Sequence, residues 1–498
     1  MDHATLSSLL LATPFAASLL PLAAHLLPII ARIGHLVVAF RAAEITPSAC
    51  YDFETRLADL TRELARTLVE WAYNHVEPED RHAMPPSLRF EGDWYRRRTK
   101  THNRAVATPF GTITLRRYLY QPIHGVERSI FPLEIRLGLV AGRATPALAE
   151  RVALAATEST QEAVRADLKR DRGVAWSVTT LRRVIAGTRQ GLIPHVHDAR
   201  VAQVLAWLER ARVSKGGREP VLAAGRDGVF VPIRGDDSYR EAATATLSVY
   251  DRSGRRLGTV YLGRMPEPGQ ASLTDELTRL ITAVLGRCPG ELPRLAYITD
   301  AGSHPTEYYR RVLKVMGHPS RPGERLEWKW VVDFYHVSSY VSKLAESLFR
   351  DPRLARAWAR RMGRMLKEQP RAMYRLLHSA AALRKRRMMV GASREAYRTA
   401  YDYLRKHLGH VDYVEYRADH LPIGSGVTEA ACKTVFSERL KRSGMGWSVE
   451  GGQRIVDLRV IRLSGVWSPV YRSYLQAKEF PESGTRGGSE TDCSRKAA

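Results

Sequence analysis

Two apolar segments that each carry an aspartate constrain the fold of this 498-residue chain more than any other feature. The first segment, residues 221–233, has Asp227 in its middle, and the second, residues 295–302, carries Asp300 near its end. Both have the apolar, β-rich composition of buried strands. A carboxylate in a core strand is costly without a partner, and a cation shared with other carboxylates is a common functional partner. The two aspartates therefore predict part of a metal site.

The elements around these aspartates predict a particular strand order. The expected elements are strands at 242–251 and 256–264, a helix with one apolar face over 273–285, the Asp300 strand, a helix over 306–316 and a strand over 326–332. Three antiparallel strands that continue into a parallel part with helical crossovers are typical of the ribonuclease-H-like fold. In that fold the first and fourth strands are neighbours, so we expect Asp227 and Asp300 to lie side by side.

The charge of the chain indicates a polyanionic partner. The formal net charge is +25 and the pI is about 10.1, an excess that concentrates nucleic acid, or secondarily an anionic membrane, around a protein. The four cysteines contain no CxxC pair, so neither a disulfide framework nor a zinc ribbon is expected. This cysteine usage favours a reducing cytosol.

The apolar residues 4–31 leave three interpretations open. They could associate with a membrane, pack as an accessory helix, or stem from a misassigned translation start. We expect Pro14, Pro21 and Pro28 to interrupt any helix here, and we expect no stable membrane partner. The next segment, 52–75, has apolar positions three and four residues apart, which predicts an amphipathic helix packed on its own domain.

Two further segments before residue 200 are candidates for DNA contact. Residues 88–120 have strand and hairpin character with a basic run at 96–104, which either follows phosphates or is a solvated face. Residues 145–190 read as helices, and the last one begins at the capping Ser177 and carries Arg182 and Arg183. This pattern is similar to a helix-turn-helix with a DNA-binding second helix, although any short helix pair in a basic protein would show the same pattern.

The helical region 351–410 carries cations at helical spacing. Arg353, Arg356, Arg360 and Arg364 would align along one side of a helix that Pro370 kinks or ends. An ordinary solvated face would interleave glutamates, and few acids occur here. We therefore favour a track for the phosphate backbone.

A glycine-punctuated loop at 421–426 leads into another helix. Glu429 lies in its first turn, where an acid suits the helix dipole. Lys433, one turn later, is expected to contact DNA phosphate or to pair with that acid, and Cys432 is expected to be a buried cysteine rather than a nucleophile. The polar, Gly- and Ser-rich tail after 482 is expected to be disordered.

Four motifs together give a family resemblance over about residues 50–465. These are GRDG at 225–228, YITDAG at 297–302, DFYH at 333–336 and PIGSGVTEAACKT at 422–434. The sequence resembles bacterial insertion-sequence DDE transposases of the IS-Kra group, which are related in active-site layout to Mutator-like transposases. Many relatives have a cysteine pair after the strand that here ends at 117–120, and this chain has none, so no zinc module is carried over.

The resemblance implies an active site and its chemistry. Asp227, Asp300 and Glu429 would be the catalytic metal ligands, and Asp333 and His336 would lie near the scissile DNA, with Lys433 added as a DNA-positioning residue. Two Mg²⁺ ions about 3.5–4 Å apart, with Mn²⁺ as a substitute, can drive in-line displacement at phosphorus. The enzyme would cleave the ends of an insertion sequence and transfer the freed 3′-hydroxyl into target DNA, as a homo-oligomer on DNA in the bacterial cytoplasm, associated with the nucleoid. A metal nuclease without strand transfer and a non-catalytic DNA-binding descendant of a transposase stay as alternatives.

These observations predict an α+β or α/β multidomain protein. It would combine a ribonuclease-H-like catalytic domain, interrupted by an α-helical insertion, with a mostly helical N-terminal DNA-binding region. The expected parts are an apolar leader (1–47), a helix with a β-hairpin (48–140), a helix-turn-helix-like region (141–215), the catalytic core (216–350), the helical insertion (351–418), the Glu helix with C-terminal helices (419–470) and the tail (471–498).

Overall fold

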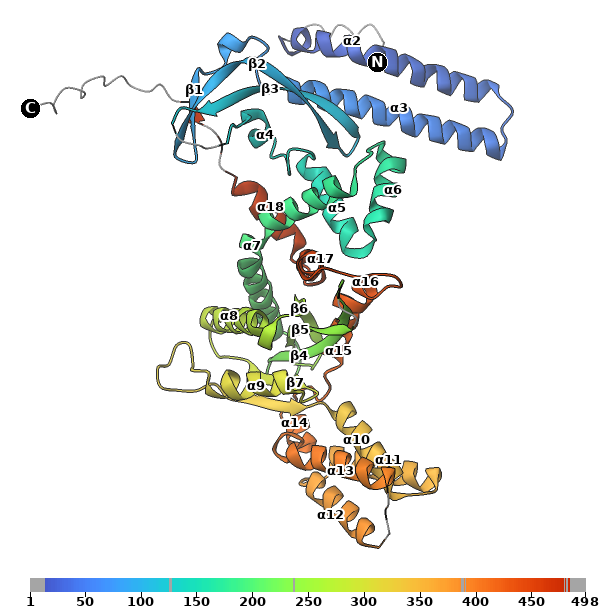
Figure 1. Cartoon of the computed structure of the whole chain (residues 1–498), viewed down its shortest axis with the longest axis vertical. Coiled ribbons are helices and arrows are strands. Elements are labelled where there is room, and N and C mark those ends of the chain that lie inside the picture. Colours follow the sequence, from blue (N-terminus) through green and yellow to red (C-terminus); the bar gives the residue numbers. More distant parts are fainter. Residues whose placement is uncertain are drawn as a thin grey trace, which may run out of the picture. The chain divides into compact units, whose positions relative to one another are not determined.

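The structure is a computed structural model that describes residues 14–124, 128–235, 238–386, 389, 391–478, 480 and 482–483. It is a mixed α and β protein with two separate sheets (Figure 1). The chain divides into two compact units. The N-terminal unit comprises Met1–Gly191 together with Ser473–Ala498, and the central unit comprises Leu192–Arg472.

The sheet of the N-terminal unit has four strands in the order β3-β2-β1-β9. The strands are β1 (Ser87–Phe90), β2 (Asp93–Thr108), β3 (Gly111–Pro122) and β9 (Glu482–Ser483), and the β2–β3 hairpin matches the strand and hairpin prediction for 88–120. β9 pairs antiparallel with β1, so the start of the expected tail belongs to this sheet. The predicted disorder after residue 483 falls on residues outside the described ranges.

The prediction that prolines would interrupt a helix near the N-terminus is wrong. Helix α2 (Pro14–Ala42) continues through Pro21 and Pro28. Each proline removes one backbone hydrogen bond, but both lie on the exposed side of the helix, where water can satisfy the freed carbonyl groups. The segment Pro21–Ala42 is the one helix in the described ranges that is long and apolar enough to cross a membrane by length and composition alone.

Helix α2 packs on α3 (Pro47–Asn74), the amphipathic helix expected at 52–75. Phe40 stacks on Phe53 with ring centroids 4.3 Å apart, and Arg32 Nη1 lies 3.0 Å from Glu63 Oε1. An ion pair in the middle of α2 fits an accessory helix packed on its own unit better than a bilayer span. Thr46 caps α3 by accepting a hydrogen bond from the Ala49 amide.

The helices predicted at 145–190 are present as α5 (Pro146–Glu158), α6 (Gln161–Arg172) and α7 (Val178–Arg212). Ser177 accepts a hydrogen bond from the Thr180 amide at 3.1 Å, which confirms the predicted cap. Gly173 ends α6 in the left-handed conformation with φ 64°, as a glycine at a helix C-terminus commonly does. α7 is much longer than the short second helix that we expected, and the boundary between the two units falls inside it.

Glu77, just after α3, has a carboxyl group that is buried in the N-terminal unit. Its side chain is 2 % exposed, and neither carboxylate oxygen makes a well-formed hydrogen bond within the described ranges. Burial raises the pKa of Glu77 to about 7, although the backbone amides of Tyr118 and Leu133 and the charges of Arg136 and Arg116 offset part of this effect. The folded state therefore favours the protonated acid.

Replacing Glu77 with Gln is expected to stabilise the protein at pH 8 by about 1–3 kcal/mol, because the amide carries no charge for burial to penalise. Because the pKa is raised in the folded state, the penalty is absent below the unfolded pKa, grows as the pH rises and is complete above about 7. Denaturant unfolding at pH 8 and pH 4.5 should show a gain at the higher pH only. The exposed neighbour Glu79→Gln is the control, and an equal gain in both variants would contradict the explanation.

The sheet of the central unit has five strands in the order β6-β5-β4-β7-β8. The strands are β4 (Val221–Pro232), β5 (Tyr239–Tyr250), β6 (Arg256–Arg264), β7 (Arg294–Thr299) and β8 (Trp328–Val332). β4, β5 and β6 are antiparallel, whereas β7 runs parallel to both β4 and β8. The predicted order and the predicted adjacency of the first and fourth strands are confirmed.

Helices connect and follow these strands. α8 (Ala271–Arg287) buries the apolar face predicted from its sequence, and α9 (Ser303–Arg311) begins and ends earlier than expected. α11 ends at Glu368, just before Pro370, as predicted. The remaining helices are α10 (Phe334–Leu348), α11 (Pro352–Glu368), α12 (Ala372–Lys385), α13 (Ala392–Lys406), α14 (Tyr413–Ala418), α15 (Gly426–Ala431), α16 (Glu438–Leu440), α17 (Val449–Leu463) and α18 (Trp467–Gln476), with a π-helical turn at Cys432–Ser437.

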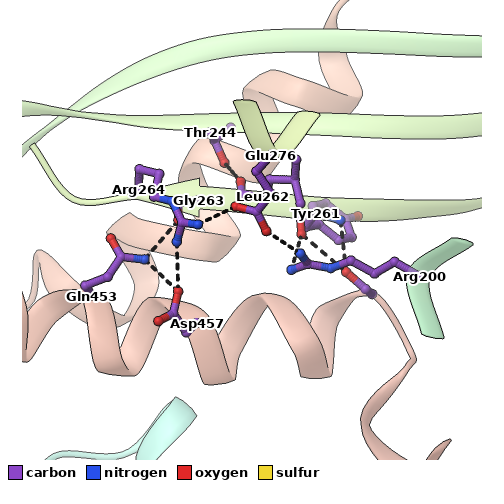
Figure 2. A network of polar contacts seen from close by, with 10 residues as sticks. Arg200, Thr244, Tyr261, Leu262, Gly263, Arg264, Glu276, Gln453 and Asp457 are labelled. Atoms are coloured by element: carbon purple, nitrogen blue, oxygen red, sulfur yellow. Dashed lines mark hydrogen bonds and ion pairs between the residues drawn. The ribbon is translucent and has the colours of Figure 1, made fainter. Parts of the chain in front are cut away.

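A buried ionic network attaches α17 to the sheet (Figure 2). Glu276 of α8 accepts from Arg200 Nη1 and from Arg264 Nη2, both at 2.6 Å, and Arg264 Nη1 also donates to Asp457 Oδ1 of α17 at 3.1 Å. Gln453 of α17 donates to the same Asp457 oxygen and to the Gly263 carbonyl. Burial alone would raise the pKa of Glu276, but the two arginines outweigh it and hold the pKa below its ordinary value. Glu276 therefore stays charged at neutral pH.

Candidate active site

The strand pairing brings the two predicted aspartates close together. β4 and β7 pair in parallel up to Gly225 and Ile298. Two residues further along each segment come Asp227, which is still in β4, and Asp300, which directly follows the end of β7. The charge of Asp300 raises the pKa of Asp227, as expected for neighbouring carboxylates. β4 is buried through Arg226, whereas Asp227 and Asp300 are half-buried. Both acids thus lie where the buried core of the sheet gives way to solvent.

Two hydrogen-bond donors hold the Asp227 carboxylate, and two other acids raise its pKa. Its Oδ1 accepts a hydrogen bond from the Gly228 amide at 2.8 Å, and its Oδ2 accepts one from the Cys432 thiol at 3.3 Å. Burial, followed by the negative charge of Asp300 and to a lesser extent that of Glu429, raises the pKa of Asp227 to about 6, although the hydrogen bonds from Cys432 and Gly228 lower it. The three predicted ligands therefore share one electrostatic environment.

Asp300 lies in a tight turn directly after β7. Its Oδ1 accepts a hydrogen bond from the Gly302 amide at 2.9 Å, and the intervening Ala301 has a left-handed φ of 63°. The Asp300 carbonyl accepts a hydrogen bond at 2.8 Å from the Tyr403 hydroxyl of α13. The helical insertion is thus attached directly to the turn that carries the second acid.

Glu429 is brought close to β4 by the residue before it. Thr428 is buried, and its hydroxyl lies 2.7 Å from the hydroxyl of Thr246 on β5. A Cβ atom at Gly225 of β4 would lie 2.1 Å from Thr428 Oγ1, so only glycine permits this approach. Glu429 lies in the first turn of α15, as the sequence predicts, and its side chain is exposed.

Asp333 fastens the loop before α15 to the start of α10. It is 3 % exposed, and its Oδ1 accepts from the His336 amide at 2.6 Å, which caps α10. Its Oδ2 accepts a hydrogen bond from the Ser425 amide. The structure gives Asp333 two backbone contacts that position the loop leading to Glu429.

The two other residues predicted near the DNA are more accessible. His336 is half-buried, and its ring lies 5.3 Å from the Tyr340 ring and 5.7 Å from the Tyr403 ring. Lys433 is exposed, one turn after Glu429. Both lie on elements that contact the site, and neither contacts Asp227 or Asp300 through a hydrogen bond within the described ranges.

The arginines predicted to bind DNA are exposed but belong to different units. Arg182 and Arg183 lie on α7 within the N-terminal unit, and Arg182 Nε donates to Gln161 Oε1 at 2.9 Å. Arg353, Arg356, Arg360 and Arg364 lie along α11 of the central unit, and in the described part of the chain none of these four pairs with an acid. Two of them, Arg356 and Arg360, line a groove of about 510 Å³ between α10 and α11.

Asp227 and Asp300 provide oxygen donors that suit Mg²⁺, and their mutual repulsion is one that a divalent cation would relieve. Over the residues that the structure describes, no group of three or more His, Cys, Asp or Glu side chains is arranged to hold a metal ion. The site is therefore an aspartate pair with a third, exposed carboxylate nearby. The residues fit a metal held partly by phosphate oxygens and water rather than a closed protein cage.

Three residues of the site were not expected to act in it. Cys432 contacts Asp227, Tyr403 holds the Asp300 turn, and Thr428 anchors the Glu429 helix. For Cys432 a signal existed, since it follows Glu429 by one helical turn and shares its face. Burial, and next the charge of Asp227, raise the pKa of the Cys432 thiol, which agrees with the expectation that it is no nucleophile. Tyr403 lies about a hundred residues from Asp300, and no local pattern could predict that contact.

Comparison with protein-family models and with curated proteins gives no match for this chain. The functional argument therefore depends on the geometry of the site, the strand arrangement and the charge distribution.

Proposed function

We propose that this protein is a DNA transposase of the DDE class. It would cleave DNA at the ends of an insertion sequence with divalent metal and transfer the freed 3′-hydroxyl into target DNA. The observation that carries the proposal is the β4–β7 pairing, which brings Asp227 and Asp300 close together, with the helix of Glu429 packed against β4 through Thr428. We propose Asp227, Asp300 and Glu429 as its catalytic residues.

The arrangement of the central unit supports a ribonuclease-H-like catalytic domain. Three antiparallel strands are followed by two parallel ones, and the strand order puts the first and fourth strands together. The helices α11–α14 lie in sequence between the second aspartate and Glu429, as a helical insertion in that fold would. This likeness concerns topology, and the proposed chemistry depends on the residues at the strand ends.

The residues present suit in-line displacement at phosphorus. Asp227 and Asp300 would hold Mg²⁺ or Mn²⁺, and Glu429 would complete the set by rotating its exposed side chain inward. When bound, such ions supply activation of the attacking oxygen and stabilisation of the leaving oxygen. The Asp333 contact holds the loop that delivers Glu429, and Lys433 can neutralise a phosphate one helical turn away.

The central test is a strand-transfer assay with a supercoiled target plasmid and duplexes that carry the ends of the element next to its gene. The expected result is a metal-dependent product in which donor 3′ ends are joined to target DNA. Hydrolysis without joined product would instead support a metal nuclease. Binding without any cleavage would support a non-catalytic DNA-binding protein. As partners we propose transposon ends, target DNA and further copies of this chain, in the cytoplasm.

Replacing Arg356, Arg360 and Arg364 together with Ala should lower the dependence of DNA affinity on salt. Each lost phosphate contact removes about 0.9 from the slope of log affinity against log salt, so the triple variant should lose about 2–3. Fluorescence anisotropy at several salt concentrations measures this slope. A matched control replaces Arg311, Arg321 and Arg398, which are also exposed but pair with Glu307, Glu324 and Glu395. Equal slopes in the wild type and in the α11 variant would rule out this track.

A further inference from the structure

Cys432 joins the helix that carries Glu429 to Asp227 by a hydrogen bond. Its thiol lies 3.3 Å from Asp227 Oδ2 and 3.7 Å from the carbonyl oxygen of Gly228. The side chain is 8 % exposed, and it begins the π-helical turn that follows α15. A π-helical turn is uncommon and is found frequently at functional sites.

The contact connects two of the proposed ligands through one helix. Cys432 follows Glu429 by three residues, so both side chains belong to the same helical face. Thr428 anchors the first turn of this helix on Thr246, and Cys432 attaches the next turn to Asp227. The position of the Asp227 carboxylate therefore depends on the same helix that presents Glu429.

We propose that Cys432 is a positioning residue for Asp227, whose S–H hydrogen bond fixes the orientation of that carboxylate for metal binding. The Gly228 amide holds one carboxylate oxygen and the thiol holds the other, so the side chain has a single defined orientation. The consequence for metal binding rests on the proposed function, whereas the contact itself does not.

The thiol and a cation can use Asp227 Oδ2 together. This oxygen has two lone pairs, so a cation can take one while the thiol keeps the other. A thiol opposes the cation less than an amide or ammonium donor would, because its hydrogen bond is weaker. The Gly228 carbonyl oxygen at 3.7 Å is a second acceptor for the same thiol.

The experiment compares Cys432→Ala and Cys432→Ser with the wild-type chain, and Cys50→Ala, a half-buried cysteine of α3, serves as control. Calorimetric titration of the full-length, DNA-free protein with Mn²⁺ is expected to show about tenfold weaker binding for Cys432→Ala, the equivalent of one hydrogen bond. Cys432→Ser keeps a donor and should stay within about threefold of the wild type. The control should bind as the wild type does.

A second measurement detects the thiol hydrogen bond itself and requires neither enzymatic activity nor metal binding by the variant. The S–H stretching band in the Raman spectrum of the wild-type protein should contain a hydrogen-bonded component that is absent from Cys432→Ala and shifts when Mn²⁺ is added. Unchanged Mn²⁺ affinity in Cys432→Ala, or a Cys432 band typical of a free thiol, would overturn the positioning role. A wild-type chain that binds no Mn²⁺ would contradict the proposed function instead, and the Raman band would still decide whether the contact exists.

Discussion

Replacing Asp227 with Asn is expected to lower the rate of DNA cleavage by about a thousandfold or more, while duplex affinity stays within about twofold. Loss of a metal ligand removes several kcal/mol of transition-state stabilisation, and each 1.4 kcal/mol is about a factor of ten in rate. Asn has nearly the same shape and keeps an oxygen for the Gly228 amide, so the strand should remain in place. Asp300→Asn and Glu429→Gln should behave alike.

The measurement combines a gel assay of end cleavage with a binding assay on the same DNA. Asp275→Asn, which changes an exposed aspartate on α8 of the same unit, is the matched control and should leave both unchanged. Thermal unfolding with and without Mg²⁺ adds an independent readout, because only proteins with an intact site should gain stability from the ion. If DNA affinity falls together with cleavage in Asp227→Asn, the role of Asp227 is not confined to metal binding.

Replacing Asp333 with Ala is expected to cost about 2–4 kcal/mol of stability and to lower cleavage about a hundredfold. The change leaves the partly buried amides of His336 and Ser425 without their acceptor, and each unsatisfied group costs about 1–3 kcal/mol. The rate falls because the loop before α15 is released and Glu429 is no longer held near Asp227, and small displacements of a reacting group are costly. Denaturant unfolding and the cleavage assay measure the two effects separately.

Asp351→Ala separates loss of a helix cap from loss of the loop contact. Asp351 caps α11 by accepting from the Arg353 amide at 2.8 Å, but it does not bind the loop before Glu429. The variant should therefore lose about 1 kcal/mol of stability and keep its cleavage rate. Asp333→Asn retains one acceptor and should lie between wild type and Asp333→Ala. If Asp333→Ala and Asp351→Ala cleave equally well, Asp333 does not position the site.

Much of the central unit could be predicted because its signals are local. β6 begins and ends at Arg256 and Arg264, as expected, since a turn sequence precedes it and its residues favour strands. The neighbouring positions of β4 and β7 followed from a topology rule rather than from any residue pair. The cap at Ser177 was equally predictable, because capping depends on residues only three positions apart.

The contacts that complete the site could not be predicted because they join distant residues. The sequence predicted that Asp333 lies near the DNA. In the structure its carboxylate oxygens accept hydrogen bonds from two backbone amides, and one of these amides belongs to Ser425, 92 residues away. The helix through Pro21 and Pro28 was missed because a rule for proline in helix interiors ignores which side faces water. The packing of α15 on β4 and β5 through Thr428, which leaves the Glu429 side chain exposed, joins residues that no local pattern connects.

The pairing of β9 with β1 has a consequence for biosynthesis. β9 lies at Glu482–Ser483, after the whole central unit, so a ribosome must synthesise that unit before this strand exists. Until then the backbone groups of β1 that pair with β9 lack this partner, and such an open edge invites pairing with foreign strands. Chains truncated between Arg472 and Glu482 would have a complete central unit but an unfinished first sheet. Such chains should be poor in yield and sensitive to proteases.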